Sequence, residues 1–467
     1  MLKLMGCLST FGDATRYKRF YRTRLSGRIK ESIQAHRTEE RNNKMSDIYS
    51  WPINPDDIRI LRGLFQRKRE LAQDPVMAER RQLWTDHASL RSQRPMILAE
   101  TQGVVDELVP ISTLQCREEW AQKLERGLRE LIFRCEQVQD DFVVEPWIEY
   151  QWEVTIGDFG VETVLVRGDN AGKLGSYHWD PPIKDLDKDF DRLHFRSLSV
   201  DREKTLAWRD LLEEQFGDIL PVRMRSNYWW TTGLTWTAIN LLGLDRLMLS
   251  MYDNPAGLHR LMAFLRDEFM YFLDWFEDGK LLSPNNENDY IGSGSVGYTT
   301  ELPQHGREDG NPALIRDLWG LSESQETVGV SPKMFEEFVF PYQQPIISRF
   351  GLSYYGCCEP LHSRIHIIKQ IPNLRRVSVS PWCKQEVMVE ELGEAYIHCR
   401  KPSPTLVSTD IFDEEAIRED VRTTLRIAAG CPLELVMKDV HTLNDQPLRL
   451  GRWVALAREV CGEFGYN

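Results

Sequence analysis

The chain has 467 residues, of which 42% are hydrophobic, and a formal net charge of −13 at pH 7. This length is enough for one large α/β barrel or for two to three ordinary domains. No apolar run approaches the roughly 18 residues of a membrane-spanning helix, and the negative charge argues against nucleic acid as a partner.

Residues 1–44 differ from the rest of the chain in charge. They hold eleven Lys and Arg residues against four Asp and Glu. The segment is basic but lacks the apolar centre of a secretory signal. We interpret it as lying outside the fold, either because the natural start is Met45 or because it is a transit peptide. Residues 45–467 are then expected to form a single domain.

The first half of that domain has three distinct parts. Apolar residues recur at helical spacing between 55 and 92, which predicts an N-terminal helical extension. RPMILAE (94–100) is typical of a buried strand, and a helix is expected at 117–137. Residues 141–220 alternate between β-like stretches and turn-rich aromatic ones, which predicts a β-rich or irregular insertion.

The second half alternates regularly between strand and helix. A strand begins at 222, and a long helical stretch follows that the Asp-Asn-Pro turn at 253–255 divides in two. Further strands are predicted at 290–296, 352–358, 375–381, 395–400 and 433–439. Repeated βα units predict an α/β fold, namely a TIM (β/α)8 barrel that carries the insertion and the helical extension. The alternatives are a doubly wound sheet, which the absence of a glycine-rich fingerprint after the first strand disfavours, and a two-domain protein.

Nine cysteines, an odd number, are spread over a long chain with no export signal. This usage predicts reduced thiols and a cytoplasmic protein. Cys357 and Cys358 are adjacent at a predicted strand end. Because neighbouring strand residues point to opposite faces, we do not expect these two cysteines to bridge.

In a barrel, the chemistry lies at the carboxyl ends of the strands. Cys357, Glu359 and His441 fall there and offer one sulfur, one oxygen and one nitrogen, a set that suits zinc. The zinc would act as a Lewis acid or lower a pKa. The alternative is that Cys357 is a small buried hydrophobic residue and Glu359 a solvated carboxylate.

Further candidates lie at other predicted strand ends. Glu326, Asp439 and His441 are candidate acid–base residues. Aromatic side chains at a strand end can hold a methylated group or a ring, although packing in the core is their more common use. The residues that we expect to bind substrate are Tyr228, Trp229, Trp230, Gln325 and Tyr355.

Five stretches resemble the uroporphyrinogen decarboxylase superfamily in order and spacing. ESQETVGVSPKMFEEFVFPYQQPI (323–346) is similar to its "SPxxFxEFxxPYxxxI" segment, and LSYYGCCEPL (352–361) to its "HxCGN" strand end. CRKPSP, TTGLTWTAINLLG and VMKDVHTLNDQPLRLGRWVALA match the "GNxDP", "GGPFTLA" and "xxPxENixAmv" patterns. The resemblance covers roughly 220–462 well and leaves 110–220 unaccounted for.

The resemblance implies a barrel enzyme on the methyltransferase side of that superfamily. Its expected reaction is methyl transfer from a small O- or N-methylated compound to a corrinoid carried by a partner protein. Departures leave two alternatives open. The family's zinc motif has Tyr355 in place of its histidine, and the early arginine motif of the decarboxylases is missing. The alternatives are decarboxylation of a tetrapyrrole or another acid, and a non-catalytic corrinoid- or tetrapyrrole-binding protein. The sequence leaves the oligomeric state open.

Overall fold

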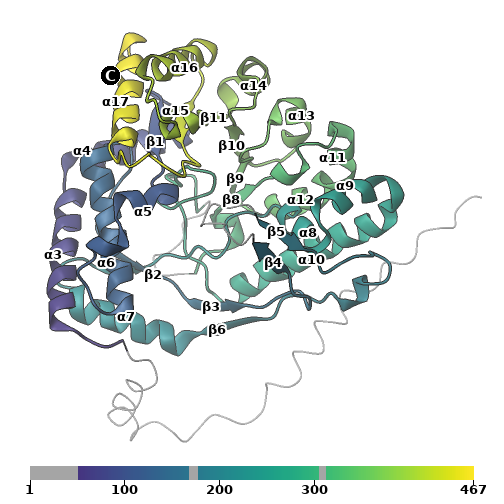
Figure 1. Cartoon of the computed structure of the whole chain (residues 1–467), viewed down its shortest axis with the longest axis horizontal. Coiled ribbons are helices and arrows are strands. Elements are labelled where there is room, and N and C mark those ends of the chain that lie inside the picture. Colours follow the sequence, from purple (N-terminus) through teal and green to yellow (C-terminus); the bar gives the residue numbers. More distant parts are fainter. Residues whose placement is uncertain (1–50, 168–176, 304–311, 467) are drawn as a thin grey trace, which may run out of the picture. The chain divides into compact units, whose positions relative to one another are not determined.

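Six parallel strands form the main sheet, in the order β1-β12-β11-β10-β9-β8 (Figure 1). The six strands are β1 (Met96–Ala99), β8 (Trp319–Ser322), β9 (Leu352–Tyr355), β10 (Leu374–Val379), β11 (Ile397–Arg400) and β12 (Leu433–Met437). Nearly all of their side chains are buried. Burial on both faces is the usual state of a parallel sheet that helices cover.

The structure is a computed structural model, and it describes residues 51–167, 177–303 and 312–466. These residues belong to one compact unit, Trp51–Asn467. The basic segment 1–44, which we placed outside the fold, lies outside the described residues.

The predicted α/β fold is confirmed, whereas the closure of eight strands into a barrel is not. Strands β8 to β12 follow one another in chain order, and β12 pairs with β1. A second parallel pair joins β2 (Ile148–Tyr150) to β7 (Val222–Met224) as a separate two-stranded sheet. The structure is therefore a mixed α/β fold with a six-stranded parallel sheet, and the described hydrogen bonds between strands do not close a ring.

Helices alternate with the strands from β8 onward. The helices of the described residues are α3 (Pro55–Ala72), α4 (Pro75–Ala88), α5 (Val105–Leu108), α6 (Glu119–Phe133), α7 (Arg202–Phe216), α8 (Thr235–Leu242), α9 (Leu244–Asp253), α10 (Pro255–Asp278), α11 (Pro332–Phe338), α12 (Phe340–Ile347), α13 (Ile365–Ile368), α14 (Gln385–Leu392), α15 (Thr405–Ser408), α16 (Glu414–Ile427) and α17 (Arg449–Glu463). The predicted N-terminal extension is present as α3 and α4. Asn54 and Asp74 cap these two helices, and a proline opens each of them, as the capping preferences favour.

The stretch 141–220 was predicted to be an insertion. One of its strands, β2, is not part of an insertion, because it pairs in parallel with β7. Two antiparallel pairs account for the β-like character of the rest. They join β3 (Glu153–Ile156) to β6 (Leu198–Asp201) and β4 (Val164–Arg167) to β5 (Tyr177–Asp180). The β-like character around β2 was predicted, but the assignment of β2 to the insertion was wrong, because the pairing with β7 joins residues far apart in the chain.

The prediction of a strand at 290–296 is wrong. This stretch forms a tight turn closed by a single antiparallel bridge between Tyr290 and Val296. Gly292, Ser293 and Gly294 all have positive φ angles, which a strand does not allow. A Cβ atom on Gly292 would lie 2.4 Å from the Leu321 side chain, so this position needs glycine for space as well as for conformation.

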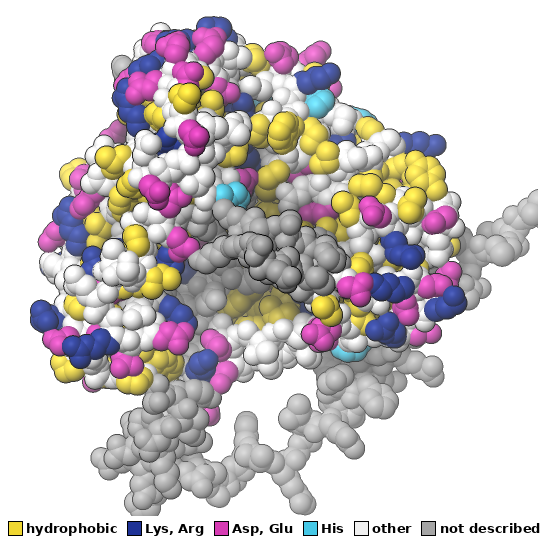
Figure 2. Space-filling view, in the orientation of Figure 1, with side chains coloured by type: hydrophobic (Ala, Val, Ile, Leu, Met, Phe, Trp, Pro, Cys, Tyr) yellow, Lys and Arg dark blue, Asp and Glu magenta, His cyan; other side chains and the backbone are white. Residues whose placement is uncertain are grey.

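The described residues include no membrane-spanning helix, and on the face seen in Figure 2 they form no patch of a single charge sign. Among the described helices, none combines the length and the apolar character needed to cross a bilayer. On the face seen in Figure 2, the described Lys and Arg side chains are interspersed with Asp and Glu.

A buried ion pair links the interior of the sheet to α4. Arg376 on β10 and Glu434 on β12 are fully buried, with Nε and Oε1 2.9 Å apart. His87 Nε2 lies 3.2 Å from the same oxygen, and the Arg376 guanidinium lies over the Trp319 ring. Burial alone would raise the pKa of Glu434, but Arg376 and His87 lower it to about 2.

Removing one partner of this pair should destabilise the fold strongly. We expect Arg376→Met to lower the free energy of unfolding by roughly 3–5 kcal/mol, because it leaves the Glu434 carboxylate buried without its cation. Urea unfolding monitored by circular dichroism measures the change. Arg59→Met is the control, since its ion pair with Asp56 is exposed and such pairs contribute about 0–1 kcal/mol.

The double variant Arg376→Met/Glu434→Leu separates charge from packing. It should recover much of the lost stability, because no unpaired charge remains. Arg376→Met within 1 kcal/mol of the wild type would contradict this account of the interior.

Candidate functional site

Polar side chains gather where the parallel strands end. Lys401 follows β11, Lys438 follows β12, and Cys357 comes two residues after β9. Because the carboxyl ends of parallel strands meet at one edge of a sheet, these residues lie together. Gly356, with φ +99°, turns the chain directly after β9. A Cβ atom there would lie 2.5 Å from Leu361 Cδ1.

Lys401 is a buried cation at this edge. Its ammonium donates to Ser293 Oγ at 2.6 Å, to the Tyr354 hydroxyl at 3.1 Å and to the carbonyl oxygen of Cys357 at 3.2 Å. It also donates to the Ser378 hydroxyl. All four acceptors are neutral, and Lys401 itself is buried. The lysine therefore holds the Ser293 turn against β9 and β10.

The two adjacent cysteines form a charged cluster with residues of the last strand end. Cys357 and Cys358 have their sulfur atoms 3.4 Å apart. Lys438 Nζ lies 3.8 Å from Cys357 Sγ, and the Cys358 thiol donates to Asp439 Oδ2 at 3.2 Å. The expectation that the two side chains point to opposite faces is wrong. They lie beyond the end of β9, in a turn, where strand alternation no longer applies.

The charges of the cluster assign its protons. The hydrogen bond from Cys358 and the nearby charges of Lys401 and Lys438 lower the pKa of Cys357 to about 6, against the effect of burial. The same hydrogen bond, burial and the charge of Cys357 raise the pKa of Cys358 above its ordinary value. Cys357 is then a thiolate at neutral pH and Cys358 a thiol. Burial would lower the pKa of Lys438, but Cys357 and Glu100 raise it.

Glu359 holds the backbone rather than facing outward. It is fully buried, and its two oxygens accept from the amides of Ser324 at 2.9 Å and Cys357 at 2.8 Å. The picture of a solvated loop carboxylate therefore does not hold. Glu359 joins the loop after β8 to the loop after β9 and so fixes the position of Cys357.

The three residues predicted to bind zinc are not grouped as ligands. Both oxygens of Glu359 are engaged by backbone amides, and His441 is exposed. Within the described ranges, no three His, Cys, Asp or Glu side chains are arranged to hold a metal ion. The donor set does not fit zinc in this geometry, and we derive no step through a metal. Zinc binding itself stays a prediction.

Two glutamates follow β8. Glu326 accepts from the Thr235 hydroxyl at 2.6 Å, and burial raises its pKa. Glu323 is fully buried, and its Oε1 has no hydrogen-bond partner in the described structure. Burial, followed by the charges of Glu326 and Glu359, raises the pKa of Glu323 well above its ordinary value. Glu323 is therefore the carboxyl group best placed to keep a proton.

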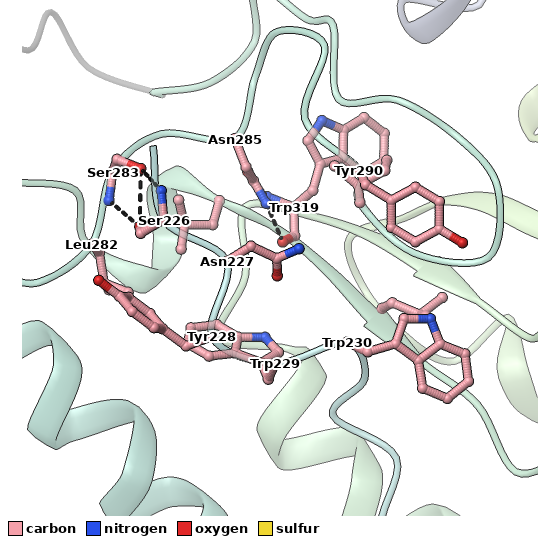
Figure 3. A pocket seen from close by; sticks show the side chains of 13 residues that line it. Ser226, Asn227, Tyr228, Trp229, Trp230, Leu282, Ser283, Asn285, Tyr290 and Trp319 are labelled. Atoms are coloured by element: carbon pink, nitrogen blue, oxygen red, sulfur yellow. Dashed lines mark hydrogen bonds between the residues drawn. The ribbon is translucent and has the colours of Figure 1, made fainter. Parts of the chain in front are cut away.

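A cavity of about 240 Å³ lies between β8 and the residues that follow β7 (Figure 3). Tyr228 and Trp229 lie on one side of it, across from Trp319 and Tyr290. Trp230 also lines it and is 40% exposed. The complete lining is Ser226, Asn227, Tyr228, Trp229, Trp230, Leu282, Ser283, Asn285, Tyr290, Ile291, Leu318, Trp319 and Leu321. None of these side chains carries a charge at neutral pH.

The predicted aromatic residues divide into two roles. Tyr228 stacks on Phe276 with ring centroids 4.4 Å apart and donates to the Leu281 carbonyl. Trp229 packs edge-on against Phe276 as well. These two residues serve both the core and the cavity wall. Trp230 is more open and is the one best placed to contact a ligand.

Tyr355 and Gln325 lie away from the cavity wall. Tyr355 is fully buried, and its hydroxyl donates to Gln343 Oε1 at 2.8 Å. The backbone amide of Gln325 donates to Glu323 Oε2 at 3.0 Å. Neither residue lines the cavity, so their predicted contact with substrate stays a prediction.

Tyr290 connects the cavity to the thiol cluster. Its ring lines the cavity, and its hydroxyl donates to Glu100 Oε1 at 2.9 Å and accepts from the Gly294 amide. Glu100 in turn is one of the groups that raise the pKa of Lys438. A hydrogen bond from Tyr290 to Glu100 and the electrostatic interaction of Glu100 with Lys438 therefore connect the aromatic cavity to the lysine beside Cys357.

The sequence analysis missed Glu323 and Lys438. The signal for Glu323 was available, because it directly follows β8, where the carboxyl end of a strand is expected to carry chemistry. Lys438 directly follows the last strand, but a lysine next to an aspartate is typical of a solvated loop, and its burial is visible only in the fold.

The comparisons with known proteins give no family. No model of a protein family matches the chain, and neither does any curated protein. Among solved structures, a methyltransferase from Methanosarcina mazei is similar with a TM-score of 0.46 and 12% sequence identity, over 81% of this chain and 97% of that one. A likeness this weak carries no argument here.

The Cys357 thiolate should be visible in a pH titration. We expect one thiol per chain to ionise at about pH 6, measured by the ultraviolet absorbance of the thiolate. Cys357→Ser should remove this step, and Lys438→Met should move it to higher pH because a neighbouring cation is lost. The control is Lys384→Met, an exposed lysine away from the cluster.

The same shift ties stability to pH. The pKa of Cys357 is lower in the folded chain than in the unfolded chain, where a cysteine has a pKa of about 8.5. The thiolate therefore contributes its full stabilisation of the fold at pH values above about 8.5. This contribution should disappear as the pH falls through about 6. A first ionisation only near pH 8.5 would contradict the assigned cluster.

Proposed function

We propose that the chain is a barrel enzyme that transfers a methyl group from a small O- or N-methylated compound to a corrinoid carried by a partner protein. In this proposal, β2 and β7 complete with the six-stranded sheet an eight-stranded ring like that of the uroporphyrinogen decarboxylase superfamily. The pairing of β12 with β1 supports it, because a barrel brings its last strand beside its first.

The observation that carries the proposal is the uncharged aromatic cavity between β8 and the residues that follow β7. About 240 Å³ is at or below the lower end of ordinary ligand pockets, which suits a small donor. Trp230, which is 40% exposed, offers a flat face to a methylated ring or a methylammonium group. Asn227 and Ser283 offer hydrogen bonds that would orient it.

The remaining chemistry is proton transfer to the atom that loses the methyl group. A corrinoid, when bound, supplies the nucleophile that accepts the methyl group. The residues of this chain would hold the donor in line and protonate its leaving atom. Glu323 suits this role because it is buried and retains a proton. Glu326, Asp439 and His441 were predicted for the same role, and among them Asp439 instead accepts from Cys358.

Exposed apolar side chains at the carboxyl edge of the main sheet support a protein partner. Four large ones stand on loops that follow strands β8, β10, β11 and β12. They are Val328, Trp382, Ile411 and Leu448. Trp382 is 72% exposed. Loops after parallel strands share one edge, so these residues surround the opening through which a carrier protein would present its corrinoid.

Decarboxylation, the first alternative, requires cations that face the substrate. Two arginines near strand ends are already paired, Arg225 with Asp289 and Arg400 with Asp420. Lys401 does face inward, and Lys438 joins it, but both lie against Cys357 rather than in the cavity wall. The uncharged cavity therefore favours a neutral or cationic donor over a polycarboxylate.

Methyl transfer can be tested with free cob(I)alamin. The protein is mixed with cob(I)alamin and a panel of methoxylated aromatics and methylamines, and conversion to methylcobalamin is followed by absorbance. We expect Trp230→Ala to raise KM with little change in kcat. Glu323→Gln should lower kcat by roughly 10²–10⁴-fold and remove the loss of rate that deprotonation of Glu323 causes at high pH.

Glu386→Gln, on the exposed face of α14, is the matched control and should leave both constants unchanged. Binding of cobalamin without turnover for any donor would favour the non-catalytic binding protein. Release of carbon dioxide from a carboxylated substrate would favour the decarboxylase.

A further inference from the structure

The loop after β9 places two thiols side by side. Cys357 and Cys358 are both reduced, and their sulfurs lie 3.4 Å apart. The positive φ of Gly356 reverses the chain just before them, so both side chains turn toward Lys438 and Asp439 instead of toward opposite faces. Cys357 is 3% exposed and Cys358 is partly exposed, so the pair has one enclosed and one open sulfur.

We propose that Cys357 and Cys358 are a peroxide-sensitive pair that closes reversibly into a disulfide between adjacent residues. The formation of this bond depends only on the geometry of the loop and not on the proposed methyl transfer. Its effect on turnover does rest on that function. The proposal assigns these cysteines a role that needs no metal.

The charges around the pair prepare one sulfur as the nucleophile and the other as the resolving thiol. Lys438 Nζ at 3.8 Å stabilises a negative charge on Cys357 Sγ. The Cys358 thiol has one hydrogen, which faces two acceptors, Asp439 Oδ2 at 3.2 Å and Cys357 Sγ at 3.4 Å, and both favour its protonated form. Such an arrangement is typical of redox-active thiol pairs.

The oxidation balances with hydrogen peroxide as the oxidant. The Cys357 thiolate attacks one peroxide oxygen, which forms a sulfenic acid and releases hydroxide. The Cys358 sulfur then attacks the Cys357 sulfur, the S–OH bond breaks, and the hydroxyl leaves with the Cys358 proton as water. Two electrons pass from the two sulfurs to the peroxide. Reduction by an external dithiol reverses the bond and restores one thiolate and one thiol.

Strain makes this bond easy to reduce. The Cα atoms of adjacent residues joined by a trans peptide lie about 3.8 Å apart, whereas ordinary disulfides span about 4.4–6.8 Å. The sulfurs also need to close from 3.4 Å to about 2.0 Å. Strained disulfides have higher reduction potentials and are the labile ones. The pair therefore suits a switch better than a permanent link.

Closure would alter the site. Oxidation removes the negative charge that faces Lys438 and the hydrogen bond from Cys358 to Asp439. Lys438 then keeps only carboxylates nearby, with Asp439 Oδ1 at 3.4 Å. Because Lys438 is linked through Glu100 to the cavity residue Tyr290, the thiol state is expected to affect the cavity.

Peptide mass spectrometry tests the bond directly. Trypsin releases both cysteines in one peptide, residues 350–364, which contains no other cysteine. The folded full-length chain is treated with hydrogen peroxide, alkylated and digested. We expect the mass of this peptide to fall by two hydrogens and neither cysteine to be alkylated. When dithiothreitol is added after the oxidation and before the alkylation, both cysteines should be alkylated again.

Variants separate the two steps. In Cys358→Ser, the sulfenic acid on Cys357 should persist and be trapped by dimedone, with no bond formed. Cys431→Ser is the control, because Cys431 is a partly exposed cysteine at the start of β12, and should behave as the wild type.

The proposal is overturned if peroxide leaves both cysteines of the peptide alkylatable, oxidises either one irreversibly to the sulfonic acid, or joins Cys357 to a cysteine outside the peptide. The bond-forming result stands or falls on wild-type protein alone. A disulfide that forms without any change in methyl transfer would contradict the effect on turnover but not the bond, whereas absence of methyl transfer in the reduced protein bears only on the proposed function.

Discussion

The burial of two lysine ammonium groups at the carboxyl edge of the sheet is the constraint on which the site depends. A charge removed from water needs hydrogen bonds or a counter-charge. Lys401 meets this need with four neutral oxygens drawn from the Ser293 turn, β9 and β10. Lys438 meets it with Cys357, Glu100 and Asp439. Each lysine therefore fixes several loops at once, and the cysteine position follows from both.

A second polar layer lies deeper in the sheet, and Tyr354 joins the two. Its ring has the Lys401 ammonium 5.5 Å from its centroid and the Arg376 guanidinium 5.7 Å from it. Its hydroxyl accepts from Lys401 and donates to the Ser293 carbonyl. Arg376 and Ser378 alternate along β10 and so face the same way. One buried ring therefore lies between the Arg376–Glu434 pair and the Lys401 ammonium that holds the loops of the site.

The sequence predicted the parts of the fold that depend on repeated local patterns. Apolar strands such as Leu433–Met437, followed by capped amphipathic helices, were identified because each pattern is complete within a few residues. It did not predict that 290–296 is a turn, because YIGSGSV has the composition of a short strand and the positive φ angles of Gly292, Ser293 and Gly294 appear only in the fold. The β-like character around β2 was predicted, but its pairing with β7 was not.

The candidate site shows the same division. Cys357, Glu359 and Asp439 were identified because strand ends are where such residues act, and the structure does place them at one edge. Their roles could not be derived, because a role depends on partners far away in the chain. Glu359 was expected to bind metal or face water, yet it accepts amides from two loops. Lys438 was missed because burial of an ammonium group is a property of the whole fold and not of a motif.

The site is built from two electrostatically different halves, and this difference constrains the chemistry. Glu323, Glu326 and Glu359 carry the acidic half, where mutual repulsion and burial keep a proton on Glu323. Lys401 and Lys438 carry the basic half, where Cys357 supplies the anion. Neither Glu323 nor Cys357 is among the residues that line the uncharged cavity, and Tyr290 reaches from its wall toward the basic half. A substrate with several carboxylates would find no cation in the cavity wall, whereas a neutral substrate would leave no charge unpaired there.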